Sequence, residues 1–391
     1  MISFIEALDH IKANTSALDV IHIKTSKALG SYLACDIYAP LDLPPFDNSA
    51  VDGFAVCVEH IRPNQSNSVE NTIRALGQDI YGLKAQSCAK IMTGAPVPMN
   101  ADAVIMKEDA HYEDSRVSFT RMPVVGAHIR KRGEDVKKGQ LVASRGKRLN
   151  PQLIGALLGL GLDEVSVFKK PRVIIICTGD ELVEAPQELK HGEVYFLVGA
   201  MLKSLAQALG LEDVQVMRVG DSEDLITHNL RQACDADLVL ITGGMSKGEY
   251  DFVRPALANI GVSEIFYQGY WRPGKPLYFG RLNNTCFFGL PGNPVACFVG
   301  FRVFVQAWLG ALFKTDDFGE LRSAELINEF TKHRDFAFFA RAQVNRSSKL
   351  KIIAGQGSHE IFSLSQSNAL CYLPAGVSRF SAGSLVEYWE I

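Results

Sequence analysis

An alternation of strand-like and helix-like segments between residues 171 and 315 constrains the fold of this chain more than any other feature. Three apolar, largely β-branched runs and two helix-like segments follow one another there: Arg172–Cys177, Met201–Leu209, Val214–Val219, Ser222–Cys234 and Asp237–Thr242. Strands and helices that alternate at this spacing are typical of a parallel sheet with crossover helices. The sequence therefore predicts a doubly wound α/β domain in this region.

The rest of the chain predicts a multidomain protein of class α/β plus β, because 391 residues exceed what one hydrophobic core usually holds. Short β-type runs with Gly and Pro turns dominate outside the α/β region. Two segments that flank one such module are individually too short to fold, so we expect them to form one discontinuous domain. We expect five parts: an N-terminal helix (1–20), domain I (21–43 and 141–170), an inserted, mostly β domain II (44–140), the α/β domain III (171–317) and a small, β-barrel-like domain IV (318–391).

Charge and apolar runs exclude several classes of protein. A net charge of −3 gives no electrostatic reason to bind nucleic acid or an anionic membrane. The longest apolar run, Val295–Leu312, carries Arg302 and Gln306 and is interpreted as a buried helix rather than a membrane span. The N-terminus lacks the regions of a signal peptide. Eight scattered cysteines without a C-x-x-C pair indicate reduced thiols, no zinc site and a cytoplasmic location.

Four polar or Gly-rich segments follow strands of the expected sheet: Thr178–Glu181, Gly220–Ser222, Gly243–Gly248 and Pro291–Pro294. Ligands of open α/β sheets bind at the carboxyl ends of the strands, so these segments are expected to share one pocket. Free N–H groups at such turns suit phosphate, although each segment alone could be a simple connection. The candidate ligand-binding residues are Thr178, Gly179, Asp180, Gly243, Gly244, Ser246, Gly248, Pro291, Gly292 and Asn293.

Three carboxylates are expected at the same edge, namely Glu181, Asp221 and Asp251. Mg²⁺ prefers a few carboxylates together with phosphate oxygens, so this group is a candidate metal site. Two simpler interpretations stay open. The three residues could be solvated acids of surface turns, and Asp221 could only cap the helix that follows it.

A turn with two cations, Arg272 and Lys275, is a candidate seat for a small oxyanion. Cationic side chains on a stiff Pro-Gly turn are preorganised donors, although two surface cations on a loop would look the same. In the N-terminal half, the stretches 47–53 and 93–96 are dense in hydrogen-bonding turn residues between apolar strands. No G-x-x-x-x-G-K-[ST] loop is present, which argues against an ordinary ATPase.

Seven stretches in order resemble the MoeA proteins and the E domain of gephyrin: LDLPPFDNSAVDGFAV, IMTGAPVPMNADAVIMKED, IRKRGEDVKKGQ, IICTGDELVE, ITGGMSKGEYDF, RPGKPLYFG and LPGNPV. The resemblance implies an elongated four-domain subunit in a homodimer, whose active site lies between domain III of one copy and domain II of the other. It also implies insertion of molybdate into adenylylated molybdopterin, with Mg²⁺-dependent release of AMP. A MogA-type adenylyltransferase is the implied partner protein.

The resemblance also assigns residues. Those implied in catalysis are Asp52, Thr93, Asp135 and Glu181, and those implied for the metal are Glu181, Asp221 and Asp251. Those implied for molybdate are Arg272, Lys275, Pro276, Arg341 and Ser358.

Two departures from the family pattern stand out. Where the family usually has an Asp-Ser/Thr-Asn stretch, this chain has Phe196, Leu197 and Val198, and a usual Ser is Ala296. They leave an alternative open, a catalytically impaired MoeA-like paralogue that binds pterin or a partner protein. Tungstate also remains an alternative to molybdate, because both are tetrahedral oxyanions of similar size.

Overall fold

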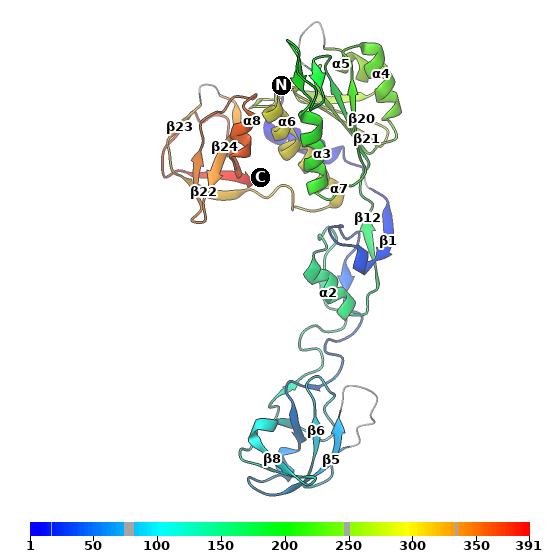
Figure 1. Ribbon diagram of the computed structural model, residues 1–391, viewed down its shortest axis with the longest axis vertical. Coiled ribbons are helices and arrows are strands. Elements are labelled where there is room, and N and C mark those ends of the chain that lie inside the picture. Colours follow the sequence, from blue (N-terminus) through cyan, green and yellow to red (C-terminus); the bar gives the residue numbers. More distant parts are fainter. Residues whose placement is uncertain (17, 74–81, 246–250, 333–334) are drawn as a thin grey trace. The chain divides into compact units, whose positions relative to one another are not determined.

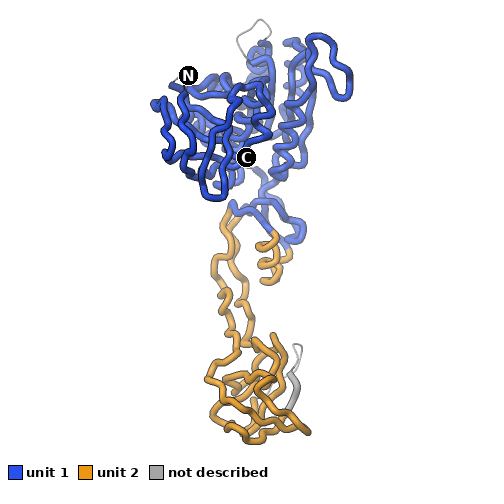
Figure 2. Tube along the Cα trace, turned by 60° about the vertical axis from the view of Figure 1, so that its left-hand side comes forward, with its two compact units in different colours: residues 1–34, 146–150, 164–391 blue, residues 35–145, 151–163 orange. Residues whose placement is uncertain are grey.

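The computed structural model describes residues 1–16, 18–73, 82–245, 251–332 and 335–391. The chain divides into two compact units, which Figure 2 colours separately. Unit 1 comprises residues 1–34, 146–150 and 164–391, and unit 2 comprises residues 35–145 and 151–163. Unit 1 contains an α/β sheet and a small β-barrel, whereas unit 2 is mostly β.

The α/β part of unit 1 is built on a six-stranded sheet. Its strands lie in the order β16 (Val214–Val219), β13 (Val173–Thr178), β17 (Leu238–Thr242), β21 (Thr285–Leu290), β20 (Tyr278–Leu282) and β18 (Ser263–Tyr267). The first four strands are parallel, and β20 and β18 add an antiparallel edge. Every residue of β13, β17 and β21 is buried, as expected for central strands covered on both faces.

Helices cover both faces of this sheet, as the alternating side chains of β13 show. Val173 and Ile175 pack in one core with α1 (Phe4–Ala13), α3 (Val198–Ala208), α6 (Pro294–Gly300) and α7 (Gln306–Phe313). Ile174 and Ile176 pack in a second core with α4 (Glu223–Gln232) and α5 (Val253–Asn259). The doubly wound arrangement predicted from the sequence is confirmed (Figure 1).

One helical run, 294–313, joins α6, a π-helical turn (Phe301–Val305) and α7. By length and composition it could cross a membrane, but 83% of its most apolar 18-residue window is buried inside the protein. It packs against Phe4 of α1 through Phe304, with ring centroids 5.9 Å apart. The interpretation of this run as a buried helix is therefore confirmed.

The C-terminal part of unit 1 closes into a five-stranded barrel. Its strands are β24 (Ala337–Val344), β25 (Lys349–Ile352), β22 (Arg322–Leu326), β28 (Leu385–Glu390) and β26 (Ala369–Leu373), and β26 pairs back with β24. The short strand β19 (Trp271–Arg272) leaves the α/β part and pairs in parallel with β24. The two-stranded pair β23 (Phe330–Thr331) and β27 (Arg379–Phe380) and helix α8 (Ile361–Ser365) complete this part.

Unit 2 contains a second six-stranded sheet around its own core. The strands lie in the order β7 (Ala103–Met106), β4 (Gly53–Val56), β6 (Ser87–Ile91), β5 (Asn67–Ile73), β9 (Arg116–Phe119) and β8 (Ala110–Glu113). Short pairs join β3 (Asn48–Ser49) to β10 (Ile129–Arg130) and β2 (Ile37–Tyr38) to β11 (Leu141–Ala143). Helix α2 spans Pro151–Gly159, and short 3₁₀ turns lie at Val58–His60 and Lys107–Asp109.

The two segments assigned to domain I pair with each other within each unit. In unit 1, β1 (Val20–Lys24) is antiparallel to β12 (Glu164–Phe168). A 3₁₀ turn (Thr25–Lys27) follows β1. In unit 2, β2 pairs with β11. These pairings are what a discontinuous domain requires, and the division into domains I to IV stays a prediction.

Candidate functional site

Loops at the carboxyl ends of three parallel strands line a cavity of about 710 Å³ in unit 1. Thr178 ends β13, Gly243 and Gly244 follow β17, and Gly292 and Asn293 follow β21. These loops approach closely, because parallel neighbours in the order β13–β17–β21 end at one edge. The structure thus brings together six of the predicted ligand-binding residues from three strand ends: Thr178, Gly243, Gly244, Pro291, Gly292 and Asn293. Ser246 and Gly248 lie outside the described residues.

Glycine is required at position 243 by conformation and by space. Its φ is +92°, and a Cβ there would lie 2.4 Å from the main-chain oxygen of Thr178. Gly292 differs, since the nearest atom to a Cβ would be Cα of Gly243 at 3.7 Å. Gly243 therefore allows the strand ends to approach, whereas Gly292 leaves open space at the cavity.

Gly179 and Asp180 were predicted to bind ligand, but neither is among the residues that line this cavity. Asp180 is hydrogen-bonded to Asp221 instead. The main-chain N–H of Asp180 donates to Oδ2 of Asp221 at 3.4 Å, and the N–H of Asp221 donates to Oδ1 of Asp180 at 3.2 Å. Ser222, at the N-cap of α4, makes no side-chain cap hydrogen bond. Asp221 is thus held by Asp180.

The acids of this edge are close enough to influence one another. Burial raises the pKa of Asp221, and the carboxylates of Asp180 and Glu181 raise it further. Glu181 and Asp251 line the cavity, whereas Asp221 does not. Among the residues that the structure describes, no group of three His, Cys, Asp or Glu side chains is placed to hold a metal ion. A cation here would need ligand oxygens in addition.

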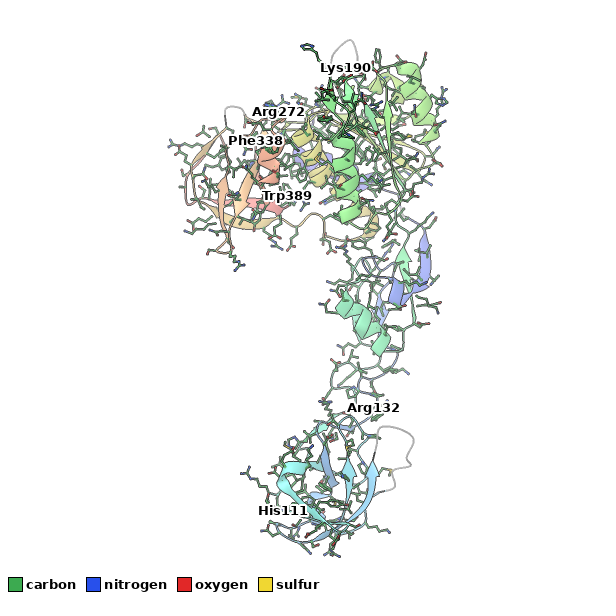
Figure 3. The ribbon with its side chains drawn as sticks, viewed as in Figure 1. His111, Arg132, Lys190, Arg272, Phe338 and Trp389 are labelled. Carbon is green, nitrogen blue, oxygen red and sulfur yellow. The ribbon has the colours of Figure 1, made fainter. Side chains whose placement is uncertain are left out.

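The cationic turn lies between the sheet and the barrel, where Arg272 pairs with Phe338 of β24 (Figure 3). Lys275 and Pro276 line the cavity. The Arg272 guanidinium donates to the main-chain oxygen of Lys275 at 3.4 Å. Both cations also lie over the ring of Phe336, at 5.3 and 5.7 Å from its centroid.

Arg341 is fully buried in β24, although sequence alone gave no sign of its burial. Its Nη2 donates to the main-chain oxygens of Gly355 and Gly357, the latter at 3.0 Å. Its Nε and Nη1 have no hydrogen-bond partner within the described part of the chain. Burial lowers the pKa of Arg341, while Glu360 opposes this effect. A buried guanidinium with unused donors is a site where an anion is strongly favoured.

Ser358 connects this buried arginine to the cavity. Its hydroxyl accepts a hydrogen bond from Nδ2 of Asn293 at 3.1 Å, and its main-chain oxygen accepts one from Val295 at 3.1 Å. Ser358 directly follows Gly357, which Arg341 contacts. The barrel loop 355–360 is therefore attached to the first residues of α6.

The remaining predicted catalytic residues lie in unit 2. Oδ1 of Asp52 accepts hydrogen bonds from the main-chain N–H and the hydroxyl of Thr93, both at 2.8 Å. These bonds, with Lys107 4.0 Å away, lower the pKa of Asp52. Asp135 is exposed, and its main-chain N–H donates to Leu43 at 3.0 Å. Asp52 and Thr93 thus form one cluster, and neither makes a hydrogen bond with Asp135 in the part of the chain that the structure describes.

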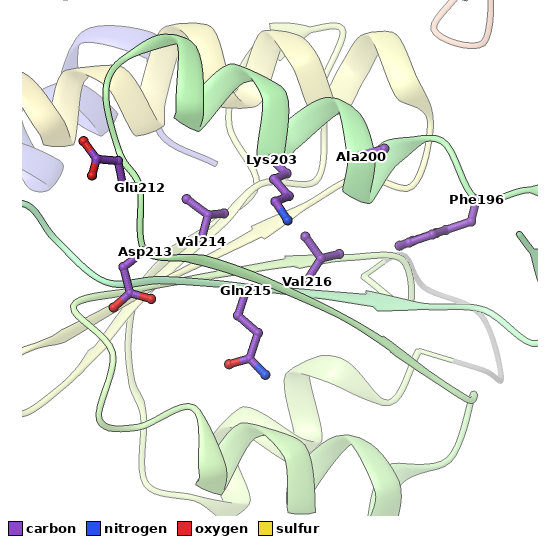
Figure 4. Close-up of a pocket in the computed structure, with 8 residues that line it drawn as sticks. All are labelled: Phe196, Ala200, Lys203, Glu212, Asp213, Val214, Gln215 and Val216. Atoms are coloured by element: carbon purple, nitrogen blue, oxygen red, sulfur yellow. The ribbon is translucent and has the colours of Figure 1, made fainter.

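Sequence reasoning missed one wall of the cavity. It consists of apolar side chains from β14 (Leu182–Val183), β15 (Val194–Tyr195) and the start of α3: Leu182, Val194, Tyr195, Phe196, Leu197 and Val198. The only signal in the sequence was the departure from the family pattern at 196–198. Phe196 also borders a second, open hollow of about 560 Å³ between α3 and β16 (Figure 4).

Three family profiles match the chain in order. They are the "MoeA N-terminal region (domain I and II)" over residues 2–161, the "Probable molybdopterin binding domain" over 174–311 and the "MoeA C-terminal region (domain IV)" over 323–391. A molybdopterin molybdenumtransferase of Haemophilus influenzae is 32% identical over 378 residues, which cover 93% of this chain and 92% of that protein. The chain belongs to the MoeA family. The resemblance drawn from the seven stretches is thereby confirmed.

Two further relatives match over all or nearly all of their length. Molybdopterin molybdenumtransferase 2 of Mycobacterium tuberculosis is 33% identical over 386 residues, which cover 95% of each chain. The crystal structure of the MoeA protein from Pyrococcus horikoshii OT3 covers 100% of both chains with a TM-score of 0.86 and 28% identity. The multidomain α/β fold of this chain is therefore the fold of that family member.

Proposed function

We propose that this protein is a molybdopterin molybdenumtransferase, which inserts molybdate into adenylylated molybdopterin and releases AMP. The observation that carries the proposal is the cavity at the strand edge, where the Gly243–Gly244 loop, Glu181 and Lys275 meet. A site for this reaction must hold a phosphorylated ligand and an oxyanion together. Gly-rich turns and a cation on one wall provide for both.

Backbone N–H groups of the Gly243–Gly244 and Gly292 turns are the proposed contacts for the phosphates of the ligand. Mg²⁺ is the cation proposed for this edge, because Glu181 and Asp251 line the cavity and Asp221, whose pKa is raised by burial and by the neighbouring carboxylates, lies beside them. Glu181 and Asp221 would hold it, with Asp251 as the third candidate. When bound, the ion would withdraw charge from the pyrophosphate that is cleaved.

Molybdate is the proposed ligand of the cations around Lys275. Arg341 supports this assignment, because its buried Nε and Nη1 donors have no partner among the described residues. Ser358 lies between Arg341 and the cavity-lining Asn293. Arg272 orients the turn by donating to the main chain of Lys275. An oxyanion held by such donors is positioned for attack by the dithiolene sulfurs of the pterin.

The assembly proposed for this activity is a cytoplasmic homodimer that receives its substrate from a MogA-type adenylyltransferase. The Asp52–Thr93 cluster of one copy would serve the cavity of the other. Mixing an Asp52→Ala variant with a Glu181→Ala variant tests this, because a shared site regenerates insertion activity in the mixed dimer. The shared site is contradicted if the mixture stays inactive although mixed dimers of the two variants have formed in solution.

The deciding experiment is insertion by the purified protein with adenylylated molybdopterin, Mg²⁺ and molybdate. Lys275→Ala should raise the molybdate concentration for half-maximal insertion by about tenfold to a hundredfold, since one charge-assisted hydrogen bond is worth about 1.5–3 kcal/mol. Lys203→Ala, which removes an exposed cation outside the cavity, is the matched control and should change nothing.

A second function is favoured by one observation. Phe196, Leu197 and Val198 line the cavity where the family usually has polar residues. An impaired paralogue would bind the pterin ligand but leave AMP unreleased when molybdate and Mg²⁺ are saturating. Release of AMP at a rate that supports turnover rejects this alternative.

A further inference from the structure

The cavity has a face of exposed apolar side chains that the mechanism above does not use. Val194, Tyr195 and Leu197 line the cavity and keep 48%, 42% and 40% of their surface exposed. Exposed apolar groups gathered in a concave site usually mark contact with a ligand. The face lies in the same cavity as the polar Gly243–Gly244 loop and Lys275, so the site offers both polar and apolar surface.

This face is held in place by main-chain hydrogen bonds. Strand β15 pairs in parallel with β14, with Leu182 opposite Val194 and Val183 opposite Tyr195. The N–H of Val194 donates to the main-chain oxygen of Glu181 at 2.9 Å, and that of Phe196 donates to Val183 at 2.8 Å. The segment that carries the apolar face is therefore hydrogen-bonded to the segment that carries Glu181.

Side chains alternate along the segment in a way that supports the face from behind. Tyr195 and Leu197 are exposed, whereas Phe196 and Val198 pack against the core. The ring of Phe196 extends toward Val216 (Figure 4). A Cβ at Gly199 would lie 2.4 Å from Cζ of Phe196 and 2.9 Å from Cγ1 of Val216. Gly199 thus leaves the space that this ring needs.

We propose that Tyr195 and Leu197 form a platform that binds a flat heterocycle of the ligand by apolar contact and determines specificity at this end of the site. The inference rests on the proposed function, which supplies a ligand with two such rings, a pterin and an adenine. Leu197 stands where the family resemblance implies a hydroxyl residue, and its side chain offers apolar area but no hydrogen bond. Apolar surfaces select ligands by size and shape rather than by polar substituents.

The test is calorimetric binding of two probes, AMP and free pterin, to the full-length protein. Leu197→Ala and Leu197→Ser should each weaken at least one probe by about fivefold to tenfold, the effect of losing a covered branched side chain. A loss for AMP assigns the nucleobase to the platform, and a loss for pterin assigns the pterin ring. Tyr195→Phe should keep wild-type affinity for the same probe, and Tyr195→Ala should lose it.

Leu158→Ala is the matched control, because Leu158 is 43% exposed and lies in α2 of unit 2. It should leave both affinities unchanged. The platform is overturned if neither probe binds the wild type, if both Leu197 variants bind both probes normally, or if Leu197→Ser binds more tightly than the wild type. Insertion activity is measured separately, so Leu197-dependent ring binding without insertion rejects the proposed function and leaves the platform standing.

Discussion

The paired glycines of the cavity allow a test that separates structural necessity from ligand contact. In Gly243→Ala the new side chain enters a backbone with φ +92°, and its Cβ would lie 2.4 Å from the Thr178 main-chain oxygen. A left-handed conformation costs about 1–2 kcal/mol for a residue with a Cβ. Moving a buried strand end to relieve the overlap adds about 1–3 kcal/mol. We therefore expect the free energy of unfolding to fall by about 2–5 kcal/mol.

Gly292→Ala is the matched substitution in the facing loop. Its Cβ meets nothing closer than Cα of Gly243 at 3.7 Å, which is ordinary contact. Stability should therefore stay within about 0.5 kcal/mol of the wild type. Affinity for AMP should nevertheless fall by about tenfold or more, because the methyl group enters the space where a phosphate would approach the main chain.

Unfolding in urea can be followed by tryptophan fluorescence, which reports unit 1 alone. The chain has three tryptophans, Trp271, Trp308 and Trp389, and all of them are buried in unit 1. AMP affinity is measured on the same preparations by calorimetry. A Gly243→Ala variant as stable as the wild type would contradict the steric role of Gly243, and so would a Gly292→Ala variant that destabilises unit 1 as much as Gly243→Ala does.

Three further predictions concern the acids and the barrel loop. The pKa of Asp221 is raised in the folded protein, so the stability that its protonated carboxyl contributes is lost as pH rises through that pKa. Asp221→Asn should therefore melt at a higher temperature than the wild type at neutral pH without divalent cations. The difference should vanish near pH 3.8, the ordinary aspartate pKa. Equal melting curves at neutral pH would contradict this. Thr93→Val removes the hydroxyl, one of two donors that lower the pKa of Asp52, and keeps the main-chain donor. A carboxyl NMR titration should therefore show a higher pKa for Asp52 in the variant. An unchanged pKa of Asp52 would mean that the hydroxyl bond is absent. Ser358→Ala deletes the exposed hydrogen bond from Asn293, so the free energy of unfolding should fall by less than about 1.5 kcal/mol. Half-maximal insertion should need more molybdate. An unchanged molybdate requirement would remove Ser358 from the oxyanion site.

The fold was predictable where the residues alone determine burial. Strands β13 and β17 are continuous apolar runs, which only a sheet covered on both faces can hide. The helix expected around Met201–Leu209 is α3 and begins at Val198, where the N-cap residue Leu197 carries no capping side chain that a sequence would reveal. Local sequence signals therefore located the strands better than the helix boundary that shapes the cavity.

The site was predictable only to the extent that it follows from strand ends. Thr178, Gly243 and Gly292 meet because parallel strands end at one edge. The acid pair of Asp180 and Asp221 depends on the conformation of two loops, which spacing does not encode. Burial of Arg341 depends on barrel closure, since its strand neighbours are apolar on both sides and no period distinguishes it.

The apolar residues at 196–198, where the family resemblance implies a polar stretch, have a consistent packing logic. Random loss of function would be expected to leave apolar side chains without regard to the direction in which they point. Here Phe196 and Val198 are partly buried and pack against the core beside the cavity, and Leu197 joins Tyr195 on the exposed face of the cavity. The space at Gly199 accommodates the Phe196 ring, which a residue with a Cβ would displace. The three changes thus preserve the backbone path that carries Glu181 and exchange polar for apolar surface at one place in the cavity. We expect such a pattern to accompany a change in ligand preference, because the support of the wall is kept while the surface it offers is apolar.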